Sequence, residues 1–158
     1  MKQTFDAIAA FLAIEEIDET GAIESDDLPL RDGVALEPRD VRSVQLAKAA
    51  IAAGVQVLLN EAGLEYDQVS ELCLAGGFGN YIDRESAADI GLLPEEMRGK
   101  IRPVGNAAGT GARMMLKNRT KSASADALCG KMRYVELSAR ADFQNLFVEK
   151  MMFGEEDW

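Results

Sequence analysis

The chain has 158 residues, of which 47% are apolar, and this is enough for one globular domain with its own core. Its 17 basic and 27 acidic residues give a formal charge of -10, which disfavours nucleic acid and anionic membranes as partners and suits a cytoplasmic protein. No uninterrupted apolar run approaches the length of a membrane-spanning helix, and the first residues lack a signal-peptide pattern. Histidine is absent, so any catalysis would use carboxylates, lysines, backbone dipoles or a bound cofactor.

The first 39 residues are expected to form a helix followed by a connector. Apolar residues recur at helical spacing from Phe5 to Ile17, with Thr4 as the expected N-cap. The segment from Asp18 to Pro38 mixes acidic residues, glycine and proline with isolated apolar residues, which predicts a connector with a small hairpin. Its acidic cluster lacks the spacing of a calcium loop, so we interpret it as a solvated face.

The longest helical pattern begins at Pro38 and ends before Gly63, which is a natural C-cap residue. Apolar residues fill more than one stripe of this helix, so we expect it to be buried on two sides. Lys48 lies within a run of small residues, and two interpretations are open for it. Its ammonium group could reach a phosphate, or its side chain could extend to solvent, which is the interpretation we favour.

A glycine-rich stretch, GGFGN, occupies residues 76–80 and follows a short apolar strand, LCLA, which we expect to be buried. Its three glycines permit positive φ angles and let a ligand lie against bare backbone, while Asn80 adds an amide that donates and accepts hydrogen bonds. Two interpretations are open at this point. The stretch is either the floor of a nucleotide site or a tight turn that needs glycine for its geometry alone.

A second unit of the same kind follows along the chain. Asp83 is expected to cap a short helix that Gly91 closes, and a brief strand is then predicted from Ile101 to Val104. This strand also ends in Gly-Asn, and small residues then open a helix. Two successive strand-to-glycine-to-helix units indicate an α/β sheet with ligand chemistry at the strand ends. Neither unit has the GxGxxG spacing of a dinucleotide site, and no GK(S/T) of a P-loop occurs.

The last part of the chain is expected to contain a helix at about 122–131, a strand at 134–137 and a helix at 138–152 with a methionine and aromatic face. Cys73 and Cys129 stand far apart in the sequence and form no CxxC pair. We interpret both cysteines as buried small apolar residues.

Three segments together resemble the carboxy-terminal ATPase part of the reductive activators of corrinoid proteins, a group within the acetate and sugar kinase, heat-shock protein and actin superfamily. They are LCLAGGFGNYIDRESAADIGLLP, IRPVGNAAGTGARMML and YVELSARADFQNLFVEKMMF. The resemblance implies an α/β fold, a partial ribonuclease H-like domain that is helix-rich with a small, largely parallel sheet. Residues 1–39 would then be part of a lid-like subdomain, and residues 40–158 would be the partial actin-like ATPase core.

The resemblance also implies which residues face a nucleotide. AGGFGN is similar to the adenosine motif of that superfamily, and VGNAAGTG is similar to the hinge helix that follows it. On this basis the nucleotide-binding residues are Gly76, Gly77, Phe78, Gly79, Asn80, Gly105, Asn106 and Ala107. ATP with Mg is the implied ligand of the complete protein, and no catalytic or metal-binding residue is assigned within this chain.

The family couples ATP hydrolysis to a low-potential electron transfer, in which a ferredoxin-type iron-sulfur cluster reduces Co(II) corrinoid to Co(I) so that a methyltransferase resumes work. The implied partners are a corrinoid protein and the amino-terminal half of the same protein, which would carry a [2Fe-2S] cluster. The family's grouped cysteines and its two phosphate loops do not occur in this sequence. We therefore expect a nucleotide-side fragment with little or no hydrolysis of its own. A non-catalytic docking or dimerisation module, present as a homodimer, is the alternative.

Overall fold

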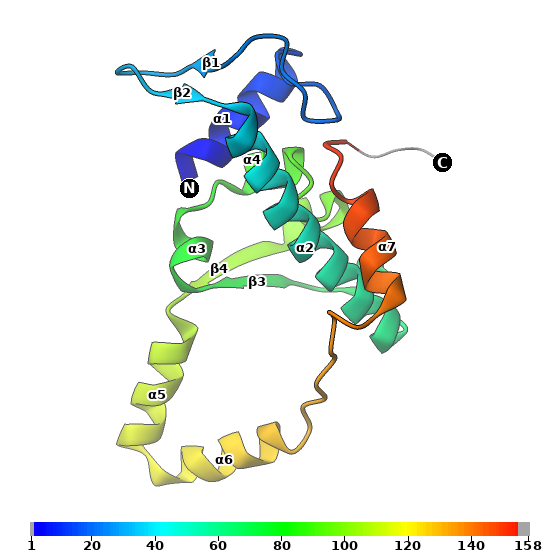
Figure 1. Cartoon of the computed structure of the whole chain (residues 1–158). Helices are drawn as coiled ribbons and strands as arrows, with labels where there is room; N and C mark the ends of the chain where they lie inside the picture. The colour runs from blue at the N-terminus through cyan, green and yellow to red at the C-terminus, as the bar shows by residue number, and fades with distance from the viewer. Residues whose placement is uncertain (1, 155–158) are drawn as a thin grey trace.

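The computed structural model describes residues 2–154, except for the side chains of residues 2, 3, 78, 80 and 119. Figure 1 shows a body from which α5 and α6 project as an arm. In chain order the elements are α1 (Lys2–Ala13), β1 (Leu28–Pro29), β2 (Ala35–Leu36), α2 (Pro38–Ala62), η1 (Tyr66–Gln68), β3 (Leu72–Ala75), α3 (Gly76–Tyr81), α4 (Arg84–Asp89), η2 (Glu95–Lys100), β4 (Ile101–Gly105), α5 (Ala107–Lys117), α6 (Arg119–Cys129) and α7 (Ala141–Glu149).

The strands form two small sheets. β1 pairs antiparallel with β2, which confirms the hairpin predicted within the connector. β3 pairs in parallel with β4, and this confirms the α/β class with a small parallel sheet. The strand expected at 134–137 is wrong, because this segment returns from α6 to α7 as coil, with no strand of the described chain paired to it.

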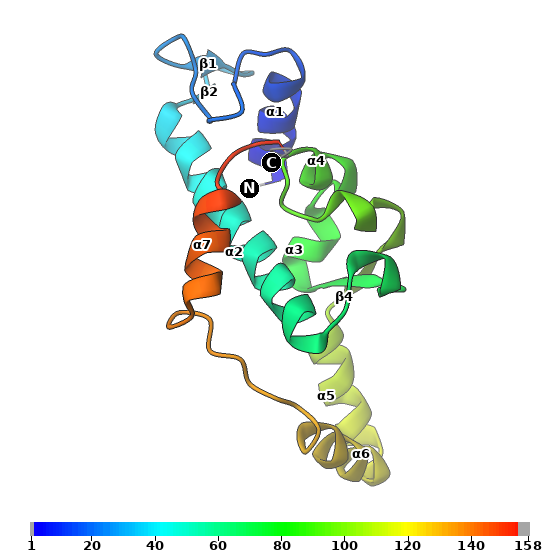
Figure 2. The same ribbon diagram turned by 90° about the vertical axis from the view of Figure 1, so that its right-hand side faces the viewer.

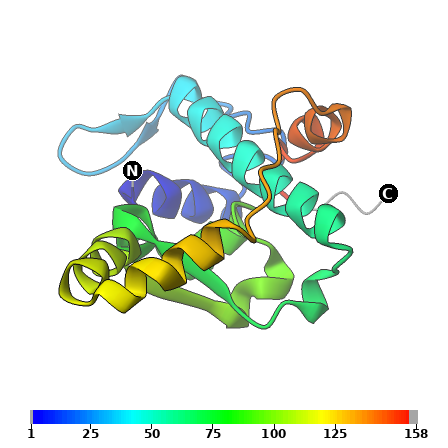
Figure 3. The same cartoon turned by 90° about the horizontal axis from the view of Figure 1, so that it is seen from below.

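α2 is the central helix and contacts both α1 and α7. Figures 2 and 3 show the order of the layers, with α7 outermost, then α2, then the β3–β4 pair. By length and composition alone α2 could cross a membrane, but its apolar residues serve packing, since Val41 and Val57 are fully buried. The predicted C-cap is confirmed, because Gly63 ends the helix at φ 65°. At the other end the Asp40 carboxylate accepts the backbone N–H of the N-cap residue Glu37 at 3.0 Å.

The hydrophobic core joins α1, the hairpin, α2, α4, the start of β4 and the segment that follows α7. Its buried members include Phe5, Ile8, Ile17, Leu28, Leu36, Val41, Val44, Ala87, Ile90, Leu92, Leu93, Ile101 and Phe153. These residues come from both sides of position 39, and the division of the chain at that position stays a prediction.

Two helix starts differ from the prediction. Thr4, the expected N-cap, lies inside α1, which also ends early because Glu15 adopts the left-handed conformation at φ 60°. The last helix begins at Ala141 and not at Ser138, since the N–H and hydroxyl of Ser138 both donate to the Glu136 carboxylate in a local turn.

β3 is less buried than its apolar sequence predicts. Leu72 and Leu74 are half-buried, whereas Cys73 and Ala75 are exposed. Helices cover one face of the two-stranded sheet, which accounts for this alternation. Cys129 is exposed as well, because it lies on the projecting arm. The interpretation of both cysteines as buried residues is therefore wrong.

Asp83 is the N-cap of α4, as predicted, and its Oδ1 accepts the backbone N–H groups of Glu85 at 3.0 Å and Ser86 at 3.1 Å. We expect Asp83→Ala to lower the free energy of unfolding by about 1 kcal/mol, because two N–H groups at the helix start lose their acceptor. Asp83→Asn keeps the acceptor oxygen and should cost much less. Urea unfolding followed by circular dichroism measures both variants, and equal losses would contradict a role of Asp83 as a hydrogen-bond acceptor.

Candidate nucleotide site

The two glycine turns lie side by side at the carboxyl edge of the parallel sheet. β3 leads into Gly76 and β4 ends at Gly105, and the register pairs Ala75 directly with Gly105. Gly76 and Gly105 both adopt positive φ angles, of 78° and 62°. The sheet therefore brings together the two motifs that the sequence places far apart.

The three glycines of the first turn have different roles. A Cβ on Gly79 would lie 2.6 Å from the backbone carbonyl of Leu74, so glycine is required there for α3 to pack against β3. Gly76 adopts a left-handed conformation, which favours glycine over other residues. At Gly77 a Cβ would meet nothing within 4 Å and no positive φ is required. Local geometry therefore explains Gly76 and Gly79, whereas no contact among the described residues requires glycine at position 77.

The second turn is held by an internal cap. The Asn106 Oδ1 accepts the backbone N–H of Gly109 at 2.8 Å and thereby begins α5. A Cβ on Gly109 would lie 2.6 Å from the Asn106 amide nitrogen, so this glycine makes room for the cap. Asn106 and Ala107 are exposed beside Gly105. Their amide and methyl groups could border a flat ligand that lies on Gly77.

Six of the eight residues predicted to bind a nucleotide are thus placed at or beside the two turns. They are Gly76, Gly77, Gly79, Gly105, Asn106 and Ala107. The backbones of Phe78 and Asn80 lie in α3, but their side chains are outside the described part of the structure. Binding of a nucleotide by these residues stays a prediction. Within residues 2–154, no group of three or more acidic or cysteine side chains is placed to hold a metal ion.

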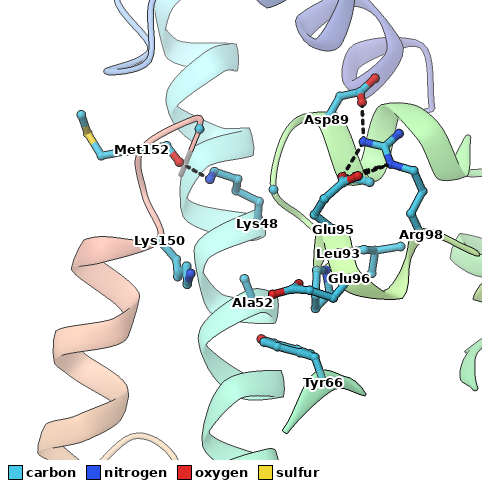
Figure 4. Close-up of a pocket in the computed structure, with 14 residues that line it drawn as sticks. Lys48, Ala52, Tyr66, Asp89, Leu93, Glu95, Glu96, Arg98, Lys150 and Met152 are labelled. Carbon is cyan, nitrogen blue, oxygen red and sulfur yellow. Dashed lines mark hydrogen bonds and ion pairs between the residues drawn. The ribbon is translucent and has the colours of Figure 1, made fainter. Parts of the chain in front are cut away.

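A pocket of about 270 Å³ lies between α2, η2 and the end of α7, and it shares no lining residue with the glycine turns (Figure 4). One wall contains Lys48, which is only 2% exposed. Its Nζ donates to the backbone carbonyl of Met152 and lies 5.2 Å from the centre of the Phe153 ring. The interpretation of Lys48 as extending to solvent is wrong, because the chain after α7 folds over it.

The charges around this pocket are divided between its walls. Arg98 forms ion pairs with Glu85, Asp89 and Glu95 at 2.5, 2.8 and 2.6 Å. On the other side, burial, and secondarily the charge of Lys150, lowers the pKa of Lys48 to about 8. The sequence contained one signal for this site, a lysine inside a run of small residues. Its partner, Met152, is too distant in the sequence to be recognised from a pattern.

The central helix, the parallel strand pair and the adjacent glycine turns define part of a domain of the acetate and sugar kinase, heat-shock protein and actin class, abbreviated ASKHA. Residues 6–158 match the family model described as the C-terminal domain of RACo, the ASKHA domain, and the chain belongs to this family.

Named relatives agree with this membership. The chain is 37% identical over 122 residues to the corrinoid activation enzyme RamQ of Eubacterium limosum. The aligned region covers 77% of this chain and 21% of the relative. The chain is 29% identical over 94 residues to a reductase of the Co(II) methylated amine-specific corrinoid protein of Methanosarcina barkeri, covering 60% of this chain and 17% of the relative.

The chain also resembles a solved structure described as the reductive activator for corrinoid, iron-sulfur protein. The two superimpose with a TM-score of 0.81 at 29% sequence identity, and the match covers 94% of this chain and 27% of the solved chain. These matches confirm the resemblance stated from the sequence. The chain spans about a fifth of the length of the curated relatives that it matches.

Lys48 should make the stability of the fold depend on pH. The unfolded chain keeps this proton up to its ordinary pKa of 10.5, while the folded chain releases it near 8. The unfolded state therefore binds more protons between these values, so the contribution of Lys48 to stability increases with pH in this window. Below it both states are protonated and the contribution is constant.

Urea unfolding of the wild type and Lys48→Met at about pH 7 and about pH 9.5 measures this effect, and the wild type should gain about 2 kcal/mol relative to the variant. Lys131→Met removes an exposed lysine from the return segment and serves as the control. An identical pH dependence in all three proteins would contradict a desolvated Lys48.

Proposed function

We propose that this chain is the adenosine-side, carboxy-terminal part of an ATP-dependent reductive activator that returns a Co(II) corrinoid protein to Co(I). The observation that carries the proposal is the register of β3 on β4, which pairs Ala75 with Gly105 and sets both glycine turns at one edge of the sheet. The names of the relatives, a corrinoid activation enzyme and a Co(II) corrinoid protein reductase, support the substrate class.

In this proposal the nucleoside of ATP lies on the open backbone of Gly77. The space there fits a flat group, because a Cβ at this position would meet no atom within 4 Å. The Asn106 side chain uses its oxygen for the α5 cap, so its amide nitrogen can donate to an acceptor on the nucleoside. The exposed Ala107 adds an apolar border.

The rest of the protein would supply the remaining chemistry. Since residues 2–154 hold no cluster of metal-ligating side chains, the ligands for Mg and the cradle for the phosphates would come from the amino-terminal half. A [2Fe-2S] cluster in that half would deliver the electron to the corrinoid, and ATP hydrolysis would supply the driving force. This chain alone is then expected to have little or no ATPase activity.

Gly77→Leu tests the nucleotide assignment directly. The fold should tolerate the leucine, because Gly77 has open surroundings and no positive φ, but the side chain would occupy the space of the nucleoside. We expect the affinity for Mg-ATP to fall about tenfold or more, measured by calorimetry on this chain joined to the rest of its protein.

Gly99→Leu is the matched control, since Gly99 in η2 also has nothing within 4 Å of its Cβ position and lies outside the two turns. Unchanged affinity in a folded Gly77→Leu protein would contradict the proposed site. Absence of Mg-ATP binding by the joined wild-type protein would contradict the nucleotide assignment as a whole.

A docking role is the second candidate, and the arm formed by α5 and α6 favours it. No described side chain in either helix is buried. Leu116 is 88% exposed, and Leu128, Met132 and Tyr134 are also exposed along the arm and the return segment. Several exposed large apolar residues on one projecting part of a chain are typical of an interface. In the complete protein it would contact the amino-terminal half, and in the isolated chain it would contact a second copy.

Sedimentation velocity of the isolated chain tests this candidate. We expect a monomer at low micromolar concentration and a dimer at high micromolar concentration. The reason is that no described part of the same chain buries the apolar residues of the arm, so a second copy would cover them. Leu116→Lys should keep the chain monomeric, whereas Val148→Lys, at an exposed position on α7, should not. A wild-type monomer at every concentration would contradict self-association.

A further inference from the structure

The pocket beside Lys48 has no part in the proposed nucleotide site. The Lys48 ammonium can donate three hydrogen bonds, and within the described chain it makes one, to the carbonyl of Met152. The nearby Phe153 ring adds a weaker attraction. No carboxylate among residues 2–154 forms an ion pair with Lys48, although the protein carries an excess of acidic residues.

Burial of an ammonium group that has no counter-ion within residues 2–154 is unfavourable, and buried charges in proteins are generally paired. Lys150 lines the same pocket and brings a second positive charge close to the first. Asp89 and Glu95 on the facing wall form their ion pairs with Arg98. Figure 4 shows the two lysines on one side of the pocket and the Arg98 cluster on the other.

We propose that this pocket binds a small anion, whose carboxylate or phosphate oxygens accept hydrogen bonds from Lys48 and Lys150. Its volume of about 270 Å³ has room for such a group together with several waters. Gly91 makes room for the Lys48 ammonium beside this space, because a Cβ there would lie only 3.2 Å from the Lys48 Nζ. Glu96 also lines the pocket and would repel a highly charged anion, so a group with one or two charges fits best.

Binding of an anion would hold the segment after α7 more firmly against α2. The segment that Lys48 holds includes Phe153, which is buried in the core and whose backbone N–H donates to the carbonyl of Glu19 at 2.7 Å. An anion between Lys48 and Lys150 would compensate both charges at the point where α7, α2 and this segment meet. The site is independent of the glycine turns and of the arm.

NMR titration of the ¹⁵N-labelled chain tests the proposal, with sodium phosphate and sodium acetate added separately at an ionic strength held constant with sodium chloride. The amide signals of Gly91 and Phe153 should shift and saturate with at least one of the two anions, and the anion that acts identifies the group that the pocket takes. Lys150→Gln should weaken binding about fivefold, because one charge-assisted hydrogen bond is lost.

Lys131→Gln is the matched control and should bind like the wild type. Lys150 is only half-buried, so Lys150→Gln should fold. The test therefore does not depend on a substitution of the buried Lys48, such as Lys48→Met. Gly77→Leu should leave the titration unchanged, which separates this site from the nucleotide site. Shifts at Gly91 and Phe153 that do not saturate, or that are equal in Lys150→Gln and the wild type, would overturn the proposal.

Discussion

The register of β3 on β4 is the constraint on which the candidate nucleotide site depends. Polar contacts hold the start of the sheet, since the Lys100 ammonium donates to the backbone carbonyl of Val69 at 2.8 Å and Arg102 forms an ion pair with Glu71. An irregularity between Leu74 and Ala75 then shifts the register, so that Ala75 pairs with Gly105. A slip of one residue would turn Leu72 and Leu74 away from the helices. The shift at the end of the strands sets the two glycine motifs side by side, so the geometry of the site depends on this irregularity as well as on the packing of the leucines.

The same sheet has one face that the described residues leave open. The run LCLA is typical of a strand covered on both faces, yet Cys73 and Ala75 are exposed. Because the chain spans about a fifth of its curated relatives, the free face and the apolar arm have an obvious source of cover in the remainder of such a protein. Under the proposed function, the surfaces that this chain leaves open are the surfaces that would close around ATP.

Local signals in the sequence predicted much of the fold. Proline and glycine marked the ends of α2, Asp83 marked the N-cap of α4, and the two glycine- and asparagine-containing stretches marked the ends of the strands. Interactions between distant segments could not be predicted in this way. Lys48 is buried by Met152, and residues 134–137 have the composition of a strand but no partner to pair with. Periodicity describes one segment at a time, whereas burial and pairing depend on the neighbours that folding supplies.

The arm formed by α5 and α6 is attached to the sheet at the second glycine turn and packs little against the rest of the described chain. Ordering two helices of 11 residues costs conformational entropy, and helices of this length are marginal in water without packing. None of the residues described between 106 and 134 is buried, so this chain supplies little to offset that cost. The arm is attached at Gly105, whose left-handed φ of 62° sets the direction in which α5 leaves the sheet. Under the proposed function, a nucleotide that contacts both turns would restrain the arm where it joins the sheet, and this would couple ligand binding to the position of the arm.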